Sequence, residues 1–382
     1  MEKIITKIQN NKTINSFKDA ANSLAFLNIA LAISILLMKK FNIGIDLKLV
    51  YEISMVFMGA LMLYLFVNKR LEHKRESLKI AVIFVSFLNL IPFLNKPESL
   101  PAYPIIASFL SLIPMVIANW LNENLIKPKD SSPTAAIDYL NQILPILVTF
   151  IVGSFSIYML SQKLYVILDI YISIVKLFST YPAVILLIIM ICGFWYNGLH
   201  GVTVISSVMR PFWFQMALYN AYFFITDQPI FFIGSEIFFQ WFIWLGGSGA
   251  TLGLSFSLKY LARSKEFQDL GEKSHRSSLH NINEAIIFGV PISQNKYFKI
   301  PFFLTPIVLS SIGYAMIYFG VIPGFSLVSP WVLPIPLGAY ISSGLSLKVL
   351  IISIGMIMIS WVIYYPFFRK YDQILLKKRC DD

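Results

Sequence analysis

Long apolar runs separated by short charged segments dominate the hydrophobic pattern of this chain. Examples are Ile80–Leu94, Pro145–Leu160, Ala183–Gly193 and Val349–Tyr365, which with their flanks approach the ~20 residues that a spanning helix needs. About ten such segments can be counted, two of them too short or irregular to span cleanly. The pattern therefore predicts an all-α polytopic membrane protein with about ten transmembrane segments.

Composition and charge agree with this interpretation. The chain is 57% hydrophobic and 13% charged, whereas a soluble domain is about 45–50% apolar. Most of its 31 lysines and arginines flank the apolar runs, in the blocks 1–20, 69–79, 119–133, 259–276 and 365–382. The positive-inside rule places such blocks, and with them both termini, in the cytoplasm. No basic patch with interleaved aromatics lies outside these blocks, so we expect no nucleic-acid partner.

The cysteine count and the start of the chain exclude several classes of site and signal. Cys192 and Cys380 are the two cysteines of the sequence, so it can contain neither a framework of several disulfides nor a CxxC metal site. We expect no metal and no cofactor. The first 20 residues are polar and bear lysines, without the short apolar core of a removable signal peptide.

The pattern changes between Tyr139 and Leu177, where Lys163, Asp169 and Lys176 interrupt the hydrophobic residues. This interruption favours a helix that lies at the membrane interface. We place a boundary here between an N-terminal transmembrane scaffold, residues 1–165, and a C-terminal half, residues 166–382, in which polar residues enter the membrane.

The C-terminal half contains passages that interrupt the helical pattern. Gly246–Thr251 combines three glycines with two hydroxyls, a composition in which helical backbone breaks and polar groups face a cavity. The proline-rich stretch 321–336 cannot be a regular helix. Residues 262–280 are interpreted as a polar loop.

Glu284 is the most informative ionisable residue of this half. Asn281 and Asn283 precede it, and the helix breakers Gly289 and Pro291 follow, which suits a re-entrant hairpin with polar groups at its tip. Ionisable groups at membrane depth are costly and usually functional. Glu284 is either a working acid or base or a buried structural anchor, and the sequence favours the working role.

Other polar and aromatic residues leave alternatives open. His200, between glycines in GLHG, fits a ligand site and a histidine bonded to a neighbouring helix equally well. Trp331 could stack on a sugar ring, but an interfacial position is favoured from the residues alone. For Arg210 and Asp227 we expect pairing or ordinary interfacial placement.

Five motifs in order, GLHG, FIWLGGSGATLGL, NINEAIIFGVPI, SPWVLPIP and VIYYPFFRKYDQ, carry a resemblance to a known family. Together they resemble the membrane-embedded enzyme IIC of the bacterial phosphotransferase system, in its lactose, cellobiose and chitobiose branch. The resemblance is dense over residues 190–375 and mostly hydropathic before them. It implies a homodimer in the bacterial cell membrane, with ten transmembrane helices and two re-entrant hairpins in the C-terminal half. In such a protein the N-terminal helices build the dimer and the C-terminal half binds the sugar.

The resemblance also implies a reaction and its partners. A disaccharide of the cellobiose, chitobiose or lactose type crosses the bilayer and is phosphorylated at a 6-hydroxyl. The donor is a phosphocysteine on a separate IIB protein, which is charged through IIA from HPr and enzyme I. This chain has no IIB-like domain, so the resemblance implies the IIC subunit of a sugar phosphotransferase, with the donor residue on the partner.

The family's histidine and glutamate motifs map onto His200 and Glu284. The resemblance implies that both lie near the accepting hydroxyl, with the glutamate as the base, and it places a sugar-stacking tryptophan at Trp331. Ala285 departs from the usual proline after the glutamate, which puts the substrate range in doubt more than the fold. The predicted substrate-binding residues are His200, Glu284, Asn281, Asn283, Trp331, Gly247, Ser248, Gly249 and Thr251.

Two other functions remain open. A proton-coupled secondary sugar transporter would use Glu284 and His200 as a proton relay. A non-transporting membrane sensor derived from such a permease is the second, and Ala285 is the hint toward it. Sugar that accumulates in phosphorylated form, and only with IIB, separates the leading hypothesis from the first of these. Failure to bind any disaccharide would favour the sensor.

Overall fold

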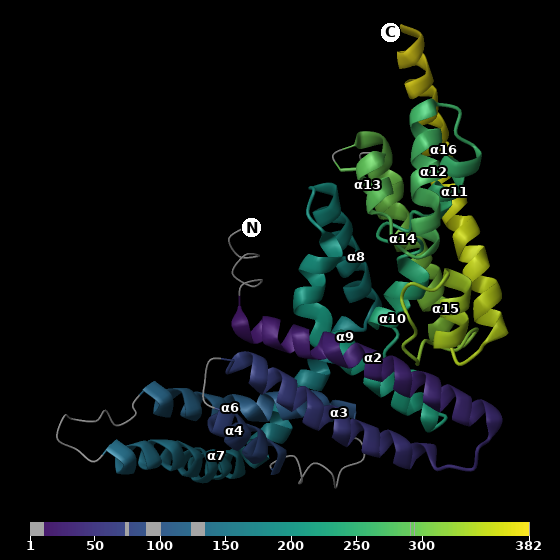
Figure 1. Ribbon diagram of the computed structural model, residues 1–382. Helices are drawn as coiled ribbons and strands as arrows, with labels where there is room; N and C mark the ends of the chain where they lie inside the picture. Colours follow the sequence, from purple (N-terminus) through teal and green to yellow (C-terminus); the bar gives the residue numbers. More distant parts are fainter. Residues whose placement is uncertain are drawn as a thin grey trace. The chain divides into compact units, whose positions relative to one another are not determined.

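The computed structural model describes residues 11–72, 76–88, 101–123, 134–290, 292–293 and 295–381, and all regular structure in them is helical (Figure 1). The earlier helices are α2 (Lys12–Phe41), α3 (Leu47–Arg70), α4 (Glu76–Leu88), α6 (Tyr103–Glu123) and α7 (Thr134–Phe178). The later helices are α8 (Tyr181–Tyr196), α9 (Gly201–Ile225), α10 (Glu236–Phe238), η2 (Phe239–Ile243), α11 (Leu252–Tyr260), α12 (Lys265–Leu279), α13 (Glu284–Gly289), α14 (Lys296–Tyr318), α15 (Ile335–Ser342) and α16 (Leu347–Asp381). The all-α prediction is confirmed for this part of the chain. Parts of four predicted basic blocks (1–10, 73–75, 124–133 and 382) and Pro291 lie outside it.

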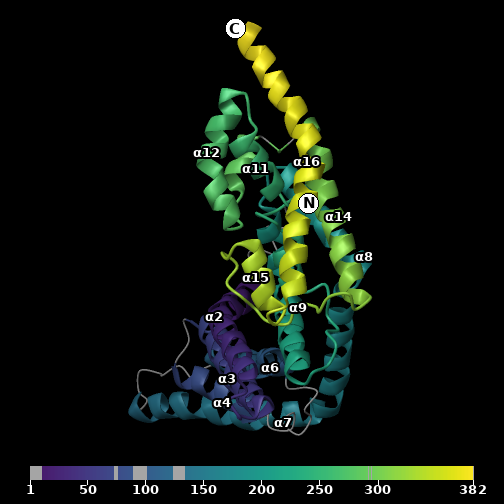
Figure 2. The ribbon, with the colours of Figure 1, turned by 90° about the vertical axis from the view of Figure 1, so that its right-hand side faces the viewer.

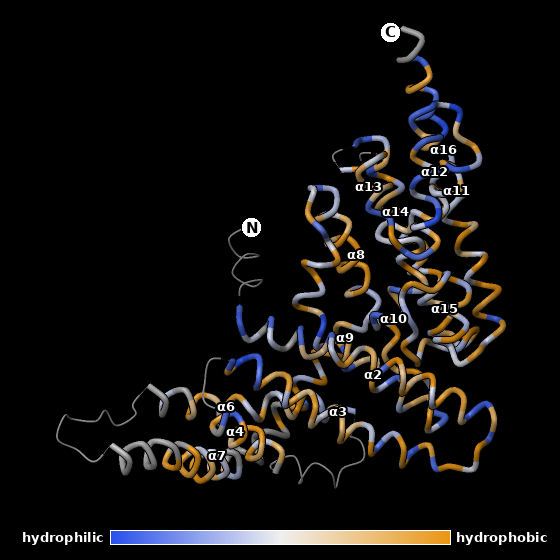
Figure 3. Tube along the Cα trace, viewed as in Figure 1, coloured by the Kyte–Doolittle hydropathy of each residue, from blue (hydrophilic) through white to orange (hydrophobic). Residues whose placement is uncertain are grey.

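Hydropathy along these helices fits a membrane protein (Figure 3). Among the described residues, four helical stretches are long and apolar enough to span a bilayer: Asp19–Phe41, Leu47–Arg70, Lys296–Tyr318 and Leu347–Lys377. A fifth span results if the last part of α7 (Leu168–Phe178) and the whole of α8 are counted as one span with a bend of 69° between them. Several membrane spans are thus supported, while the total of ten stays a prediction.

The chain packs into two compact units. The first unit comprises Met1–Leu27 and Gly44–Ile174, and the second unit comprises Asn28–Ile43 and Val175–Asp382. The boundary that we predicted at residue 165 lies inside α7, which runs for 45 residues without a break. Lysine and aspartate interrupt the hydropathy of this helix without ending it, because neither residue prevents helical backbone.

In the first unit, α3 packs against α4 and α6. Its buried face follows the spacing of an amphipathic helix, with residues three or four positions apart turned inward. That face includes Tyr51, Met55, Met58, Met62 and Phe66. The large share of methionine suits irregular gaps between helices, since its side chain is unbranched and flexible.

In the second unit, α11 lies between α12 and α16, and α14 packs against α8 and α16 (Figure 2). The described backbone from Phe319 to Pro334 is not helical, which confirms the prediction for most of the proline-rich stretch. The π-helical turn η2 leads directly into the glycine-rich turn after it. Such π-helical turns are rare and often occur at functional sites.

The prediction of a polar loop over residues 262–280 is wrong, because most of this stretch forms helix α12. Its buried face recurs every three or four residues but is built mainly from small or polar side chains: Phe267, Gly271, Ser274, His275 and Ser278. A Cβ at Gly271 would lie 2.5 Å from the backbone of Leu258, so close packing of α11 against α12 requires glycine here. A hydropathy pattern cannot detect such a face.

The start of α12 is fixed by a carboxylate from another helix. Asp372 of α16 is buried and accepts hydrogen bonds from the Ser264 amide (2.9 Å), the Ser264 hydroxyl (2.6 Å) and the Arg263 amide (3.0 Å). A carboxylate at a helix N-terminus satisfies free amide groups and interacts favourably with the helix dipole. The last of the five motifs therefore contains a residue that anchors α12.

The His275 imidazole lies between α11 and α12, where its Nδ1 is 2.9 Å from the Ser255 hydroxyl. Burial lowers the pKa of His275 below its usual value, and the nearby Lys259 charge lowers it further, while Glu272 opposes the shift. The ring is therefore neutral at pH 7 and serves the packing of these two helices.

Candidate functional site

His200 is the N-cap residue of helix α9, which begins at Gly201. Its Nδ1 accepts a hydrogen bond from the Thr203 amide (3.2 Å) and lies 2.9 Å from the Thr203 hydroxyl, so the side chain caps the helix. These bonds assign the proton of the neutral ring to Nε2. The Trp195 ring lies against the imidazole, with 4.3 Å between ring centroids. Capping and ring packing together fix the direction in which Nε2 points.

Glu284 is the first residue of helix α13 and faces that nitrogen. Its Oε1 lies 3.7 Å from His200 Nε2, and each side chain is 47% exposed. Its Oε2 is buried and has no hydrogen-bond partner in the structure. Buried polar atoms are rarely left without partners, so this oxygen calls for an explanation. The pair thus offers a donor and an acceptor to a bound group, 84 residues apart in sequence.

The glycine-rich turn between η2 and α11 has left-handed backbone at four positions. These are Gly246 (φ 73°), Gly247 (φ 108°), Gly249 (φ 78°) and Ala250 (φ 55°). Two α16 side chains bond its carbonyls: Tyr364 donates to Gly249 (2.7 Å) and Ser360 donates to Ala250 (2.6 Å). The predicted break of the helix is confirmed here. Two carbonyls of the turn accept hydrogen bonds from side chains of α16.

Asn283 connects this turn to Glu284. Its buried amide nitrogen donates to the Ser248 carbonyl and to the Thr251 hydroxyl, each at 2.7 Å. A Cβ on Gly247 would lie 2.3 Å from the Asn283 amide, so only glycine leaves room for it. The residue before the glutamate is therefore fixed by the turn, which positions Glu284.

Asn281 makes a second connection. Its amide nitrogen donates to the carbonyls of Trp331 (2.7 Å) and Leu333 (3.0 Å), and its oxygen accepts from the Gly246 amide (3.3 Å). Asn281 itself has left-handed backbone (φ 64°), which asparagine tolerates better than most residues. Three passages that the sequence analysis singled out are thus held together by two asparagines.

The predicted site residues fall into two groups. His200 and Glu284 face each other with accessible polar atoms. The side chains of Asn283 and Thr251 are buried in the hydrogen bonds of the turn, and Trp331, 53% exposed, joins the network through its carbonyl. Direct contact of the turn residues and of Trp331 with a sugar stays a prediction.

Sequence reasoning missed two residues of this unit, Trp195 and Glu236. Trp195 packs on His200, and its position five residues earlier in the same passage was the available signal. Glu236 forms two short hydrogen bonds (2.7 and 2.8 Å) with Arg210, so the expected pairing of the arginine is confirmed but its partner was not anticipated. The pairing expected for Asp227 is also confirmed, with Lys39 at 2.6 Å. Among the described residues, no cluster of three or more histidine, cysteine or acidic side chains could hold a metal.

The capping role of His200 makes its replacement informative. We expect His200→Ala to lose the cap, about 1 kcal/mol of stability, and, if the chain has the function that the resemblance implies, to weaken sugar binding or phosphoryl transfer at least tenfold. His200→Asn restores a capping side chain but supplies no imidazole. If the asparagine variant recovers both melting temperature and sugar phosphorylation, the histidine is only a cap. We expect it to recover the melting temperature alone.

These features define a helical membrane protein with a histidine and carboxylate pair beside a glycine turn. The family model described as phosphotransferase system, EIIC matches residues 2–306. The chain therefore belongs to this family of membrane components.

Individual relatives agree with the family. The chain is 34% identical over 188 residues to a lichenan permease IIC component of Bacillus subtilis (strain 168). These residues are 49% of this chain and 42% of that protein. It is 32% identical over 184 residues to a cellobiose-specific EIIC component of Geobacillus stearothermophilus, 47% and 40% of the two chains. The matched part thus spans less than half of each relative.

The fold is that of a solved transporter. The crystal structure of ChbC, the IIC component from the N,N'-diacetylchitobiose-specific phosphotransferase system, superposes with a TM-score of 0.78. The match covers 99% of this chain and 98% of that one at 20% sequence identity. At this identity the similarity establishes the fold alone.

Proposed function

We propose that this protein is a permease IIC subunit that binds a disaccharide of the cellobiose, chitobiose or lactose type and moves it across the membrane. The sugar is phosphorylated at a 6-hydroxyl by a phosphocysteine of IIB as it arrives. The observation that carries the proposal is the facing pair of His200 and Glu284, in which His200 Nε2 lies 3.7 Å from Glu284 Oε1 and each side chain is 47% exposed. The sugars named for the relatives, lichenan and cellobiose, support the substrate class.

The geometry supports a direct phosphoryl transfer. The sugar hydroxyl donates a hydrogen bond to Glu284 Oε1, the oxygen that faces His200, and His200 Nε2–H donates to the same hydroxyl oxygen and orients it. As that oxygen attacks the phosphorus, its proton passes to Glu284, the P–S bond of the phosphocysteine breaks, and the sulfur leaves as a thiolate on IIB. Since Asn283 is fixed by the turn, Glu284 is held in position for this step.

The arrangement in the membrane is part of the proposal. Ten transmembrane helices and two re-entrant hairpins would form a homodimer, with residues 1–165 as its scaffold and residues 166–382 as the sugar-binding part. Both termini and the basic block 259–276 would face the cytoplasm, where IIB docks. Within that block Lys259 pairs with Glu272 and Lys265 with Asp269. Lys273 and Arg276 are exposed, so helix α12 rather than a loop presents the docking charge.

The phosphoryl donor should come from the partner and not from this chain. Cys192 is 2% exposed and its thiol lies against the Phe302 carbonyl (3.5 Å), so it is no accessible thiolate. We expect the double variant Cys192→Ser and Cys380→Ser to keep its rate of sugar phosphate formation within about twofold, with purified phospho-IIB as donor. The control is the same variant without IIB, which should form none. Loss of the reaction with sugar binding intact would assign the phosphoryl carrier to this chain.

A further inference from the structure

The second unit contains a pocket of about 640 Å³ at the end of α9 opposite His200. Helix α9 has 25 residues, so at about 1.5 Å per residue its ends are up to ~37 Å apart. The pocket is lined by the end of α2, the connection after α9, and the backbone turns at 320–326 and 343–345. It is therefore separate from the pair of His200 and Glu284.

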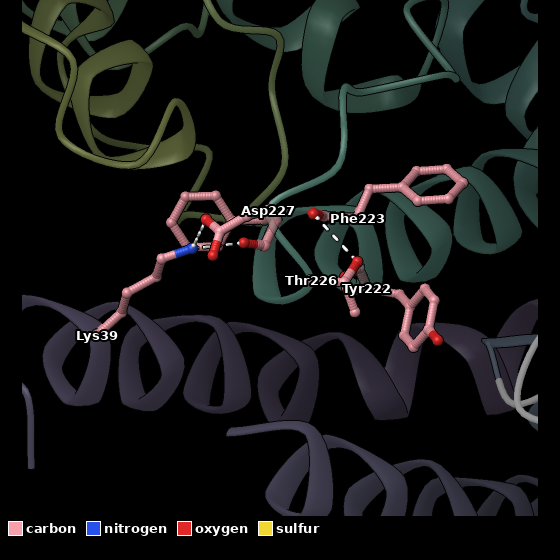
Figure 4. Close-up of polar contacts among 6 residues, drawn as sticks. Lys39, Tyr222, Phe223, Thr226 and Asp227 are labelled. Atoms are coloured by element: carbon pink, nitrogen blue, oxygen red, sulfur yellow. Dashed lines mark hydrogen bonds and ion pairs between the residues drawn. The ribbon is translucent and has the colours of Figure 1, made fainter. Parts of the chain in front are cut away.

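An ion pair forms the polar part of the pocket. Lys39 Nζ donates to Asp227 Oδ1 (2.6 Å) and to the Phe224 carbonyl (2.7 Å), as the close-up shows for Lys39 and Asp227 (Figure 4). The ammonium also lies 4.4 Å from the centroid of the Phe224 ring. These contacts fix the cation, because its hydrogen bonds and the cation–π contact act together.

The carboxylate of this pair keeps capacity for a ligand. The Asp227 side chain is 81% exposed, against 31% for Lys39. An ionised carboxylate accepts about four hydrogen bonds, of which the lysine uses one. Asp227 also has left-handed backbone (φ 55°), and so has Leu345 (φ 65°), which also lines the pocket. Unfavourable backbone of this kind occurs often at ligand-binding positions.

We propose that this pocket is a second binding site for the disaccharide, used before the sugar reaches His200 and Glu284. This inference rests on the proposed function for the identity of the ligand. A sugar hydroxyl both donates and accepts, so vicinal hydroxyls match a carboxylate beside an ammonium. The two charges largely offset each other, which disfavours an ionic ligand. The volume lies within the ~300–1,000 Å³ typical of small-molecule sites.

A second site that the sugar occupies first should affect the kinetics of uptake from the side opposite IIB only. We expect Asp227→Ala to raise the KM for uptake of sugar about tenfold from the side opposite IIB, with kcat within about twofold. Phosphorylation of sugar that is supplied on the IIB side should be unchanged. The matched control is Glu52→Gln, which removes a partly exposed carboxylate from the surface ion pair with Lys48 on α3. A KM that rises equally from both sides, or from neither, would overturn the proposal.

Occupancy can be measured directly by thiol protection. Gln228 lines the pocket and is exposed, so Gln228→Cys in a Cys380→Ser background gives a thiol for a hydrophilic maleimide. Ile43→Cys, exposed beyond the end of α2 and not part of the lining, is the control. We expect cellobiose or chitobiose to slow labelling at position 228 but not at position 43. The protection should persist when His200→Ala and Glu284→Ala remove the other site.

The outcomes separate the two proposals. If the protection at position 228 disappears when His200 and Glu284 are replaced by alanine, the sugar acts on position 228 from the other site, and the second site is rejected. A chain that forms sugar phosphate without any protection at 228 also rejects it. Protection in a chain that forms no sugar phosphate with phospho-IIB keeps the pocket as a sugar site and rejects the phosphotransferase function instead.

Discussion

Glu284→Gln is expected to lower the rate of sugar phosphorylation by at least about 100-fold, while the affinity for the sugar changes by less than about tenfold. The amide has nearly the shape of the carboxylate and can still hydrogen-bond the sugar, but it cannot accept the hydroxyl proton. The position of His200 should not change, because its Nδ1 is held by hydrogen bonds to Thr203 of α9 and not by Glu284. The two quantities are measured with phospho-IIB as donor and by equilibrium sugar binding.

Glu284→Asp is the matched control for this prediction. It keeps a carboxylate but shortens the side chain by one methylene, so a partial rate should remain. A glutamine variant that phosphorylates sugar at the full rate would remove Glu284 from the role of base. Equal loss of binding and of rate would make it a binding residue only.

Asn283→Asp is expected to lower the stability of the second unit by about 3 kcal/mol or more. The substitution replaces a buried amide, which donates to the Ser248 carbonyl and the Thr251 hydroxyl, with an oxygen that faces the carbonyl. It also buries a charge, which is costly without a partner. Since Asn283 precedes Glu284, sugar phosphorylation should be lost even in the molecules that remain folded. Thermal unfolding in detergent and the phospho-IIB assay measure the two effects.

Asn197→Asp provides the comparison for that variant. Asn197 is exposed after α8, and its amide donates only to the Gly193 carbonyl of its own helix (2.8 Å). We expect its free energy of unfolding to change by no more than about 0.5 kcal/mol, as for an ordinary surface substitution, and its melting temperature to shift correspondingly little. Equal melting temperatures of the Asn283 and Asn197 variants would mean that the hydrogen bonds of Asn283 to Ser248 and Thr251 contribute little to stability.

Sequence patterns predicted the helical class and one local break well. Hydropathy identifies long apolar helices because the bilayer requires about 20 apolar residues in each span. The glycines of Gly246–Thr251 predicted a helix break, and the backbone there is left-handed at four positions. The approach of His200 and Glu284 followed from the family resemblance and not from spacing, because no local pattern relates residues 84 positions apart.

Other features could not be obtained from patterns. Helix α12 was mistaken for a loop because its buried face uses glycine and serine in close packing, which hydropathy does not register. The anchoring of its start by Asp372 joins residues more than 100 positions apart. The capping role of His200 depends on where α9 begins, and element boundaries are weakly encoded in single sequences. In each case tertiary contacts, and not local preference, determine the structure.

The most direct test of the central claim follows the chemical state of the sugar inside vesicles. The wild-type chain is reconstituted, loaded with purified phospho-IIB, and given a labelled disaccharide from outside in the presence of a protonophore. The account predicts that the accumulated label is entirely sugar phosphate, in amounts limited by phospho-IIB and insensitive to the protonophore. Accumulation of free disaccharide that needs a proton gradient and no IIB would contradict it and identify a proton-coupled transporter.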